Sequence, residues 1–305
     1  MIPHFPQFKN LELTDKKEIE NFTLQFLPYA EYQFTTLCCW EIHQPFQASI
    51  INNNLLIKQT NCLTGDYFFS LVGTNALLQT IKELADFFKQ HQLPCALRCV
   101  PEETVKCLEG AVVNITEDRD NFDYIFSVRE FFHAKGNNYK IYRHKISAFN
   151  KEYPTVSVTQ IDLTQKKIQD QVNTLFKKWT KNKELEKKEC EAACEFKALK
   201  KLLSSAHEFN GLVALSIFDK DEMIAFSIND INNEKIMTGL FWKANTEYKG
   251  IYQFLMNEIV KFSHSRGIEF LNWESDLGIE SLRRSKMNLH PLFFFKKYTV
   301  EFLEI

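Results

Sequence analysis

Two carboxylates lie close together after a short apolar run, in an order that suits proton transfer. Glu274 and Asp276 follow Asn272 and Trp273 almost directly. A carboxylate just beyond the end of a strand can act as a general base toward an attacking amine or hydroxyl, if the geometry allows it. The alternative for Asp276 is that it caps the helix that carries Leu282. Glu274 and Asp276 are therefore candidate catalytic residues.

Cationic and polar side chains accompany these carboxylates in the sequence. Arg283 and Lys286 stand three residues apart, so on a helix they share a face and could bind a phosphate or a carboxylate. Lys243 ends an earlier apolar run, and Tyr252 and Gln253 begin the helical pattern that follows it. We expect Lys243 to join the catalytic residues and the other four to bind a substrate or an anion. Core packing is the alternative role for Tyr252.

The pattern around these residues predicts the elements that position them. Apolar runs at residues 212–218, 223–229 and 235–243 predict an antiparallel meander, followed by a helix over residues 250–265 and a strand over residues 269–273. A strand, a helix and a strand in this order form a right-handed crossover between parallel strands. Ligands bind beyond the carboxyl ends of such strands, and the amide groups of the helix start favour an anion there. We therefore expect Lys243 and Glu274 at one cleft.

The remaining patterns predict an α+β fold with two domains, residues 1–130 and 131–305. Hydrophobic periodicity predicts helices over residues 14–27 and 77–88 in the first domain, and over 139–149, 168–179 and 196–203 in the second. Short β-branched and aromatic runs predict strands at residues 46–51, 55–60, 67–72, 96–100, 111–115, 124–128 and 155–161. The expected sheets are mixed and mostly antiparallel, with helices flanking them.

Charge is unevenly distributed along the chain. The formal net charge is −2, yet residues 131–151 and 281–297 each hold five Lys or Arg and no acid, so the rest of the chain carries −12. Acid-free basic segments in an acidic chain indicate a locally held anionic ligand, or alternatively two solvated helix faces. In the first segment the candidate anion-binding residues are Lys135, Lys140, Arg143 and His144.

Composition excludes several classes of protein. A chain of 305 residues that is 45% hydrophobic and 25% charged is typical of a globular protein. No apolar window approaches the length of a membrane span, and the first ten residues show no secretory signal. Eight cysteines without such a signal predict reduced thiols in a cytoplasmic protein. No nucleotide-binding, serine-hydrolase or zinc motif is present, so we expect no metal and no tightly bound cofactor.

Several of these segments resemble a known family. They resemble the bacterial proteins related to the C-terminal domain of phosphatidylglycerol lysyltransferase, along nearly the whole chain and most densely after residue 120. The matching positions are Lys135-Gly136, Arg143-His144, Phe149, Tyr153-Pro154, Ala225 to Ile228, Lys243 to Asn245, Gly250 to Gln253, Glu274 to Gly278, Leu282-Arg283, Lys286 and His290-Pro291.

The resemblance implies two tandem acyltransferase folds of the GNAT type, related to the aminoacyltransferases that use charged tRNA. Two features depart from related patterns. Where acyl-CoA-binding GNAT proteins carry a basic and a small residue around the start of the helix, this sequence has Glu247 and Tyr252, which disfavours pyrophosphate binding. The lysyltransferases also carry a large membrane domain ahead of this region, and the sequence shows none.

The leading hypothesis is an aminoacyl- or acyltransferase whose donor is aminoacyl-tRNA and whose acceptor is an amine or hydroxyl, such as a lipid head group. Glu274 or Asp276 would assist proton removal, and Lys243, Arg283 and Lys286 would offset negative charge. Charged tRNA and an anionic lipid are the expected partners, with the protein cytoplasmic or peripheral at the inner membrane face. The alternatives are an N-acyltransferase that uses acyl-CoA and a non-catalytic binding protein with the same fold.

Overall fold

The computed structural model describes residues 1–108, 110–182 and 189–303, which form two compact units. Unit 1 comprises Met1–Tyr124, Glu274–Lys286 and the chain from Phe294 onward, and unit 2 comprises Ile125–Trp273 and Met287–Phe293. This division differs from the predicted single boundary at residue 130. Segments near the C-terminus return to unit 1, because their strand and helix pair with elements of the first 124 residues.

Unit 1 is built on a seven-stranded sheet with the order β1-β2-β3-β4-β5-β14-β6. Neighbouring strands are antiparallel except β4 and β5, which are parallel. The strands are β1 (Lys9–Asn10), β2 (Gln47–Ile51), β3 (Asn54–Thr60), β4 (Tyr67–Val72), β5 (Ala96–Pro101), β6 (Val113–Glu117) and β14 (Lys297–Phe302). Strand β14, near the C-terminus, thus lies between β5 and β6, two strands from the first 120 residues.

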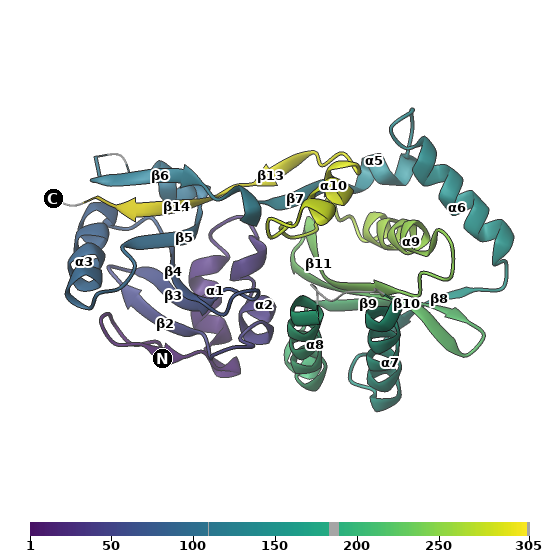
Figure 1. Cartoon of the computed structure of the whole chain (residues 1–305), viewed down its shortest axis with the longest axis horizontal. Helices are drawn as coiled ribbons and strands as arrows, with labels where there is room; N and C mark the ends of the chain where they lie inside the picture. The colour runs from purple at the N-terminus through teal and green to yellow at the C-terminus, as the bar shows by residue number, and fades with distance from the viewer. Residues whose placement is uncertain (109, 183–188, 304–305) are drawn as a thin grey trace. The chain divides into compact units, whose positions relative to one another are not determined.

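Helices pack on both faces of this sheet (Figure 1). They are α1 (Lys16–Thr23), α2 (Phe34–Cys39), α3 (Leu77–Gln90) and α4 (Glu102–Lys106), with 3₁₀ turns at Leu13–Asp15, Ala30–Tyr32 and Arg119–Asn121. Unit 1 also holds α10 (Glu280–Met287) as far as Lys286. The 3–4 residue spacing of Leu77, Ile81, Leu84 and Phe88 places these side chains on one face of α3. That face closes a core cluster with side chains of β3, β4, β5 and β14.

Unit 2 contains the second sheet, with the order β13-β7-β12-β11-β10-β9-β8. The meander is antiparallel, and β11 and β12 pair in parallel from Ile236 opposite Phe270 to Thr238 opposite Asn272. The strands are β7 (Asp123–Ser127), β8 (Ser157–Ile161), β9 (Leu212–Asp219), β10 (Glu222–Asn233), β11 (Ile236–Ala244), β12 (Phe270–Asn272) and β13 (Phe293–Phe295). The predicted strand–helix–strand crossover is confirmed.

The helices of unit 2 also cover both faces of their sheet. In Figure 1, α7 and α8 lie on one side, and α9, with α5 and α6 packed against it, lies on the other. The bounds are α5 (Val128–His133), α6 (Lys140–Glu152), α7 (Lys166–Asn182), α8 (Glu189–Ser204) and α9 (Ile251–Ser265). On α9, Ile251, Leu255 and Ile259 are buried and Phe262, on the same face, is half-buried.

The sequence prediction differs from the structure mainly in the first unit. The predicted helix over residues 14–27 is a 3₁₀ turn followed by α1, which ends at Thr23. The sequence pattern does not predict α2, α4 or β14, because these elements are short and their residues carry no strong period. In the part of the chain that the structure describes, no helix combines the length and the apolar character that crossing a membrane requires.

Candidate functional site

The structure distributes the predicted site residues over both units. Unit 1 holds Glu274, Asp276, Arg283 and Lys286, and unit 2 holds Lys243, Tyr252, Gln253, Lys135, Lys140, Arg143 and His144. The expectation that Lys243 and Glu274 share one cleft therefore stays a prediction. Each unit has its own polar centre, and the two are described separately.

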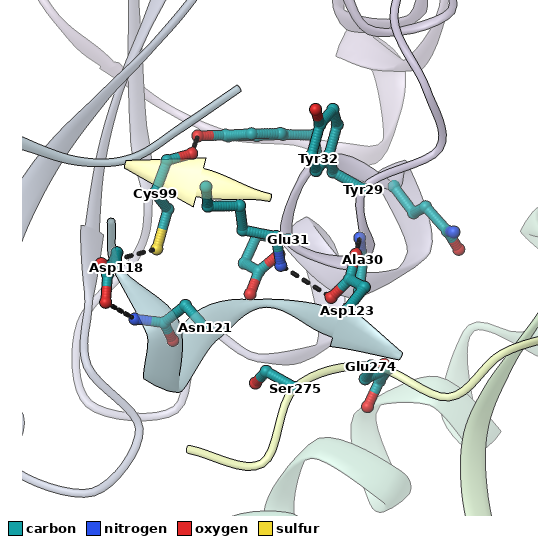
Figure 2. Close-up of polar contacts among 12 residues, drawn as sticks. Tyr29, Ala30, Glu31, Tyr32, Cys99, Asp118, Asn121, Asp123, Glu274 and Ser275 are labelled. Carbon is teal, nitrogen blue, oxygen red and sulfur yellow. Dashed lines mark hydrogen bonds and ion pairs between the residues drawn. The ribbon is translucent and has the colours of Figure 1, made fainter. Parts of the chain in front are cut away.

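The polar centre of unit 1 is built around a lysine that has no contact with solvent. Lys297 on β14 is fully buried, and its Nζ donates to a carboxylate oxygen of Glu31 and, at 2.7 Å, to Oδ1 of Asp123. The other oxygen of Asp123 accepts the backbone N–H of Ala30 at 2.9 Å. Figure 2 shows Glu31, Ala30 and Asp123 converging at this point. We call Lys297, Glu31 and Asp123 the Lys297 cluster.

The Lys297 cluster has two carboxyl groups and one ammonium group, and this excess of acidic groups together with burial shifts their pKa values. Burial by itself would lower the pKa of Lys297, but the charges of Asp123 and Glu31 outweigh it and raise the pKa. Burial raises the pKa of Glu31 to about 7, against the opposing charge of Lys297. One ammonium group therefore compensates two carboxyl groups, and Glu31 is the one that takes up a proton near neutral pH.

Glu274 lies beside this cluster on a strained piece of backbone. Its φ of +53° is in the left-handed region, and its backbone carbonyl accepts the N–H of Tyr124 at 3.2 Å. The side chain is half-buried. Burial raises the pKa of Glu274 to about 8, with the negative charges of Asp123 and Glu31 adding to the shift and Lys286 opposing it. Figure 2 shows Glu274 and Ser275 in the chain segment next to Asp123.

Lys286 is held over the same segment. Its Nζ donates to the carbonyl of Ser275 at 2.7 Å and to the carbonyl of Glu274 at 3.3 Å, and it lies 5.5 Å from the ring centre of Tyr124. Burial lowers the pKa of Lys286 to about 8, although the charge of Glu274 acts in the opposite direction. A carboxyl group and an amino group that both titrate near neutral pH are typical of sites for general acid–base catalysis.

Asp276 has a different environment from Glu274, two residues earlier. It is fully buried and accepts Nε and Nη2 of Arg283 at 3.0 and 2.8 Å, Nη1 of Arg119 at 3.2 Å and the hydroxyl of Tyr124 at 2.5 Å. Burial would raise the pKa of Asp276, but the hydrogen bonds from Arg283 and Tyr124 lower it. Both oxygens of Asp276 are engaged, so its carboxylate fixes the loop that follows Glu274.

Arg283 and Lys286 thus donate hydrogen bonds to acceptors within unit 1. Besides Asp276, Arg283 contacts Asp120 at 2.6 Å, and Lys286 binds the two backbone carbonyls. The predicted anion-binding face of α10 is occupied by these intramolecular partners. The bidentate geometry that suits Arg283 to a phosphate is used here for a carboxylate of the same chain.

The polar centre of unit 2 lies at the carboxyl end of β11, where topology predicts a site. Lys243 is buried, and its Nζ contacts a carboxylate oxygen of Glu195 at 2.5 Å and lies 4.3 Å from the ring centre of Trp179. Tyr252, in the first turn of α9, is half-buried. Burial raises the pKa of Tyr252 to about 12, with the Ala244 backbone and the Trp179 side chain acting against the shift. We call Lys243, Glu195 and Trp179 the Lys243 centre.

The start of α9 lies close to the backbone of α6. Gly250 has φ +87°, and a side chain there would bring Cβ within 3.1 Å of the carbonyl of Lys145. Glu247 accepts the side-chain amide of Asn245 at 2.9 Å and lies 3.4 Å from Nζ of Lys178. The hydrogen bond from Asn245 and then the charge of Lys178 lower the pKa of Glu247, so an anionic residue stands before this helix.

The predicted basic residues of the second unit lie at its surface. Lys135 precedes α6, Lys140 begins it, and His144 lies one turn later; all three are exposed. Arg143 is also exposed, but its Nη1 donates to the carbonyls of Ala134 and Gly136 and so holds the loop between α5 and α6. Gln253 is half-buried in the first turn of α9.

Sequence reasoning missed Glu31, Asp123, Lys297, Glu195 and the role of Trp179. Lys297 follows a run of three phenylalanines and an exposed Lys296, so its sequence context resembles a basic surface segment. Within residues 1–108, 110–182 and 189–303, no three His, Cys, Asp or Glu side chains gather closely enough to hold a metal ion.

The fold class follows from these two units. Each has a mixed, mostly antiparallel sheet flanked by helices, with one parallel pair across a crossover helix, and together they form the tandem GNAT-like fold. The model of the phosphatidylglycerol lysyltransferase C-terminal region matches residues 25–301, and the chain belongs to this family. A search among curated proteins finds no match.

Solved structures share the fold at low sequence identity. A conserved protein of unknown function from Bacteroides thetaiotaomicron is 23% identical, with a TM-score of 0.84, and the match covers 99% of this chain and 100% of that one. A C-terminal domain assigned to a lysylphosphatidylglycerol synthetase of Agrobacterium fabrum has a TM-score of 0.65 at 11% identity, covering 96% and 93%. The L-PGS of Bacillus licheniformis has 0.61 at 12% identity, covering 99% and 93%.

Proposed function

We propose that this protein is an aminoacyltransferase that moves the acyl group of an aminoacyl-tRNA to an amine or hydroxyl acceptor, such as a lipid head group. The observation that carries the proposal is the family match over residues 25–301. The solved relatives include an L-PGS and a domain assigned to a lysylphosphatidylglycerol synthetase. Both names refer to the transfer of a lysyl group to a phospholipid.

The role that we propose for Glu274 is proton transfer. The acceptor nitrogen or oxygen forms a bond to the acyl carbon while the ester bond to the tRNA ribose breaks. The acceptor must lose a proton and the ribose oxygen must gain one. A half-buried carboxyl group whose pKa is raised to about 8 can accept the first proton and return it to the second position.

The other site residues support this role in our proposal. Asp276 is a positioning residue, because its two oxygens are already bound by Arg119, Arg283 and Tyr124. Lys286 supplies positive charge beside Glu274. Lys135 and Lys140 on the exposed start of α6 contact the tRNA backbone or an anionic membrane surface, which would hold the protein at the cytoplasmic side of the membrane.

The test of the donor is a side-by-side binding titration with lysyl-tRNA, uncharged tRNA and acetyl-CoA. We expect tRNA binding whose association constant falls steeply with salt concentration, because each phosphate contact releases counterions. The double variant Lys135→Gln/Lys140→Gln should reduce the slope of log K against log salt by about one to two. Stabilisation by acetyl-CoA together with no tRNA binding would replace this donor with acyl-CoA.

The test of the chemistry is the variant Glu274→Gln. We expect a loss of about 10²–10⁴-fold in the rate of lysyl transfer from lysyl-tRNA to phosphatidylglycerol vesicles, with tRNA affinity retained. Glu280→Gln is the matched control, because Glu280 is an exposed glutamate on α10 whose contact to Arg284 is at the surface. Equal rates for both variants and the wild type would remove Glu274 from the mechanism.

A further inference from the structure

A cavity of about 300 Å³ opens at one end of the unit 1 sheet, and its lining includes none of the site residues described above. It is lined by side chains of β1, β2, β3 and β4 and of the loop before β2: Asn10, Gln44, Pro45, Gln47, Lys58 and Tyr67, together with Gln59 and Thr60. None of these residues belongs to the Lys297 cluster. A cavity of this volume accommodates a small organic molecule.

Strand register explains why these side chains meet. Lys58 and Thr60 alternate onto the same face of β3, Gln47 lies opposite Lys58 on β2, and Tyr67 lies opposite Thr60 on β4. On β1, Asn10 lies opposite Gln47 and accepts its side-chain amide at 3.0 Å. The positions of Asn10, Gln47, Lys58, Thr60 and Tyr67 are therefore fixed by strand pairing, and the loop before β2 adds Gln44 and Pro45.

Two side chains in this cavity can form further polar interactions with a ligand. Lys58 is half-buried, its Nζ lies 4.5 Å from the ring centre of Tyr67, and no carboxylate of the described residues pairs with it. Thr60 is 8% exposed, and its hydroxyl has no hydrogen-bond partner among the described residues. A buried hydroxyl without a partner destabilises the folded chain, so it needs an explanation.

The charges and polar groups define the ligand. Of the eight described residues that line the cavity, Lys58 alone is charged, so the site suits one anionic group and offers no carboxylate to an ammonium group. The amides of Asn10, Gln44 and Gln47 suit the N–H and C=O groups of a peptide bond. A single lysine suits a carboxylate with one negative charge better than a phosphate, which is usually held by several donors.

We propose that this cavity binds the C-terminal carboxylate of an N-acylated amino acid or short peptide. Lys58 pairs with the carboxylate, Thr60 donates its hydroxyl hydrogen to it, and the Tyr67 ring packs against the adjoining carbon atoms. The site is a second binding site of the chain and does not depend on the proposed transfer reaction.

The test uses the intact chain and a matched pair of ligands in calorimetric titrations. N-acetylglycylglycine should bind at least about tenfold more tightly than N-acetylglycylglycinamide, which differs only in lacking the negative charge. Free glycylglycine should bind more weakly than its acetylated form, because its ammonium group finds no acid in the cavity. Equal affinity of acid and amide, no saturable binding, or binding of inorganic phosphate alone would each overturn the proposal.

Two variants connect the binding to the cavity. Lys58→Met should abolish the preference for the acid over the amide, and Lys58→Arg should retain it. Thr60→Val should weaken binding of the acid severalfold and raise the thermal midpoint of the free protein by about 2 °C or more, because it removes a buried hydroxyl without a partner. If Thr60→Val lowers the midpoint, or if Lys58→Met leaves the preference intact, the assigned contacts are wrong.

Discussion

The two units of this chain follow one plan, a β-meander with a crossover helix to a parallel strand, yet each handles its buried lysine differently. In unit 1, Lys297 is held by two carboxylates: Asp123, which is fully buried like Lys297 itself, and Glu31, whose side chain is 19% exposed. In unit 2, Lys243 is held by one carboxylate, Glu195, and by the face of Trp179. The side chain of Glu195 keeps 22% exposure, so water can replace its partner.

This difference separates a closed ionic network from an open one. In the closed network Lys297 and Asp123 are both fully buried, so the removal of either one leaves a buried charge without its main partner. Removal of the lysine from an open network costs less free energy of unfolding, because solvent reaches the remaining carboxylate. The unit with the closed network also holds Glu274 and Lys286. Burial and the negative charges of Asp123 and Glu31 raise the pKa of Glu274, whereas burial lowers the pKa of Lys286 against the effect of the nearby carboxylates. The comparison yields four predictions.

The largest effect is expected for Lys297→Met. It leaves Asp123 buried without its ammonium partner, and we expect a loss of about 3–5 kcal/mol in the free energy of unfolding measured by urea denaturation. Lys296→Met is the matched control, because Lys296 is 40% exposed and pairs at the surface with Glu117, so it should cost less than about 1 kcal/mol. Hydrogen exchange should show faster opening in unit 1 peptides. Equal effects of the two variants would show that Lys297 is not essential to the network.

A smaller loss is expected for Asp276→Asn, which changes another buried carboxylate of unit 1. The variant weakens the charged hydrogen bonds to Arg283 and Arg119, both of which can turn to solvent, and should cost about 2–3 kcal/mol by the same measurement. Asp120→Asn breaks a contact to the same Arg283 but at a 60% exposed side chain, so its cost should stay below about 1 kcal/mol. A larger cost for Asp120→Asn would reverse the assigned roles.

Lys243→Met tests the open network of unit 2. The methionine keeps an apolar stem against Trp179, and Glu195 gains access to water, so we expect a loss of about 1–2 kcal/mol. Lys235→Met removes an exposed pair with Glu269 in the same unit and should change the free energy of unfolding by less than about 0.5 kcal/mol. A cost as large as that of Lys297→Met would mean that the two networks are equally closed.

The fourth prediction is a dependence of stability on pH. Folding raises the pKa of Glu31 to about 7 and of Glu274 to about 8, so between about pH 4.5 and 8 the folded state binds more protons than the unfolded state. Stability should therefore fall as pH rises through this range, by at most about 1.4 kcal/mol per pH unit and group. Folding lowers the pKa of Lys286 to about 8, so its contribution recovers between about pH 8 and 10.5.

The measurement is the urea midpoint of the wild type from pH 5 to 10. A minimum near pH 8 is expected, and Glu274→Gln should make the decline from pH 5 to 8 shallower. Asp276 does not mask this decline, because its pKa lies below the ordinary aspartate value and its contribution is lost only in stronger acid. A midpoint that rises steadily from pH 5 to 8 in the wild type would contradict the assigned shifts.

Much of the fold could be predicted from local pattern. The alternation along residues 212–243 and the period of α9 determine the meander and the crossover helix, and the parallel pairing of β11 with β12 follows from them. The first unit was harder, because α2 and α4 have six and five residues and too few turns to establish a period. The position of Glu274 directly after β12 predicts it as a candidate base. The sequence pattern predicts the same role for Asp276 and does not reveal the hydrogen bonds to Asp276 from Arg119, Arg283 and Tyr124.

The sequence by itself determined the α+β class, the strand–helix–strand core of unit 2 and the candidate segment from Glu274 to Lys286. Only the tertiary structure decided which charges meet. Lys297 reaches Asp123 across 174 residues and Glu31 across 266. No local period records contacts over such separations, because they arise when β14 inserts between β5 and β6 and carries its lysine into the core. Local side-chain patterns specify elements, and the pairing of distant strands specifies the electrostatics of the site.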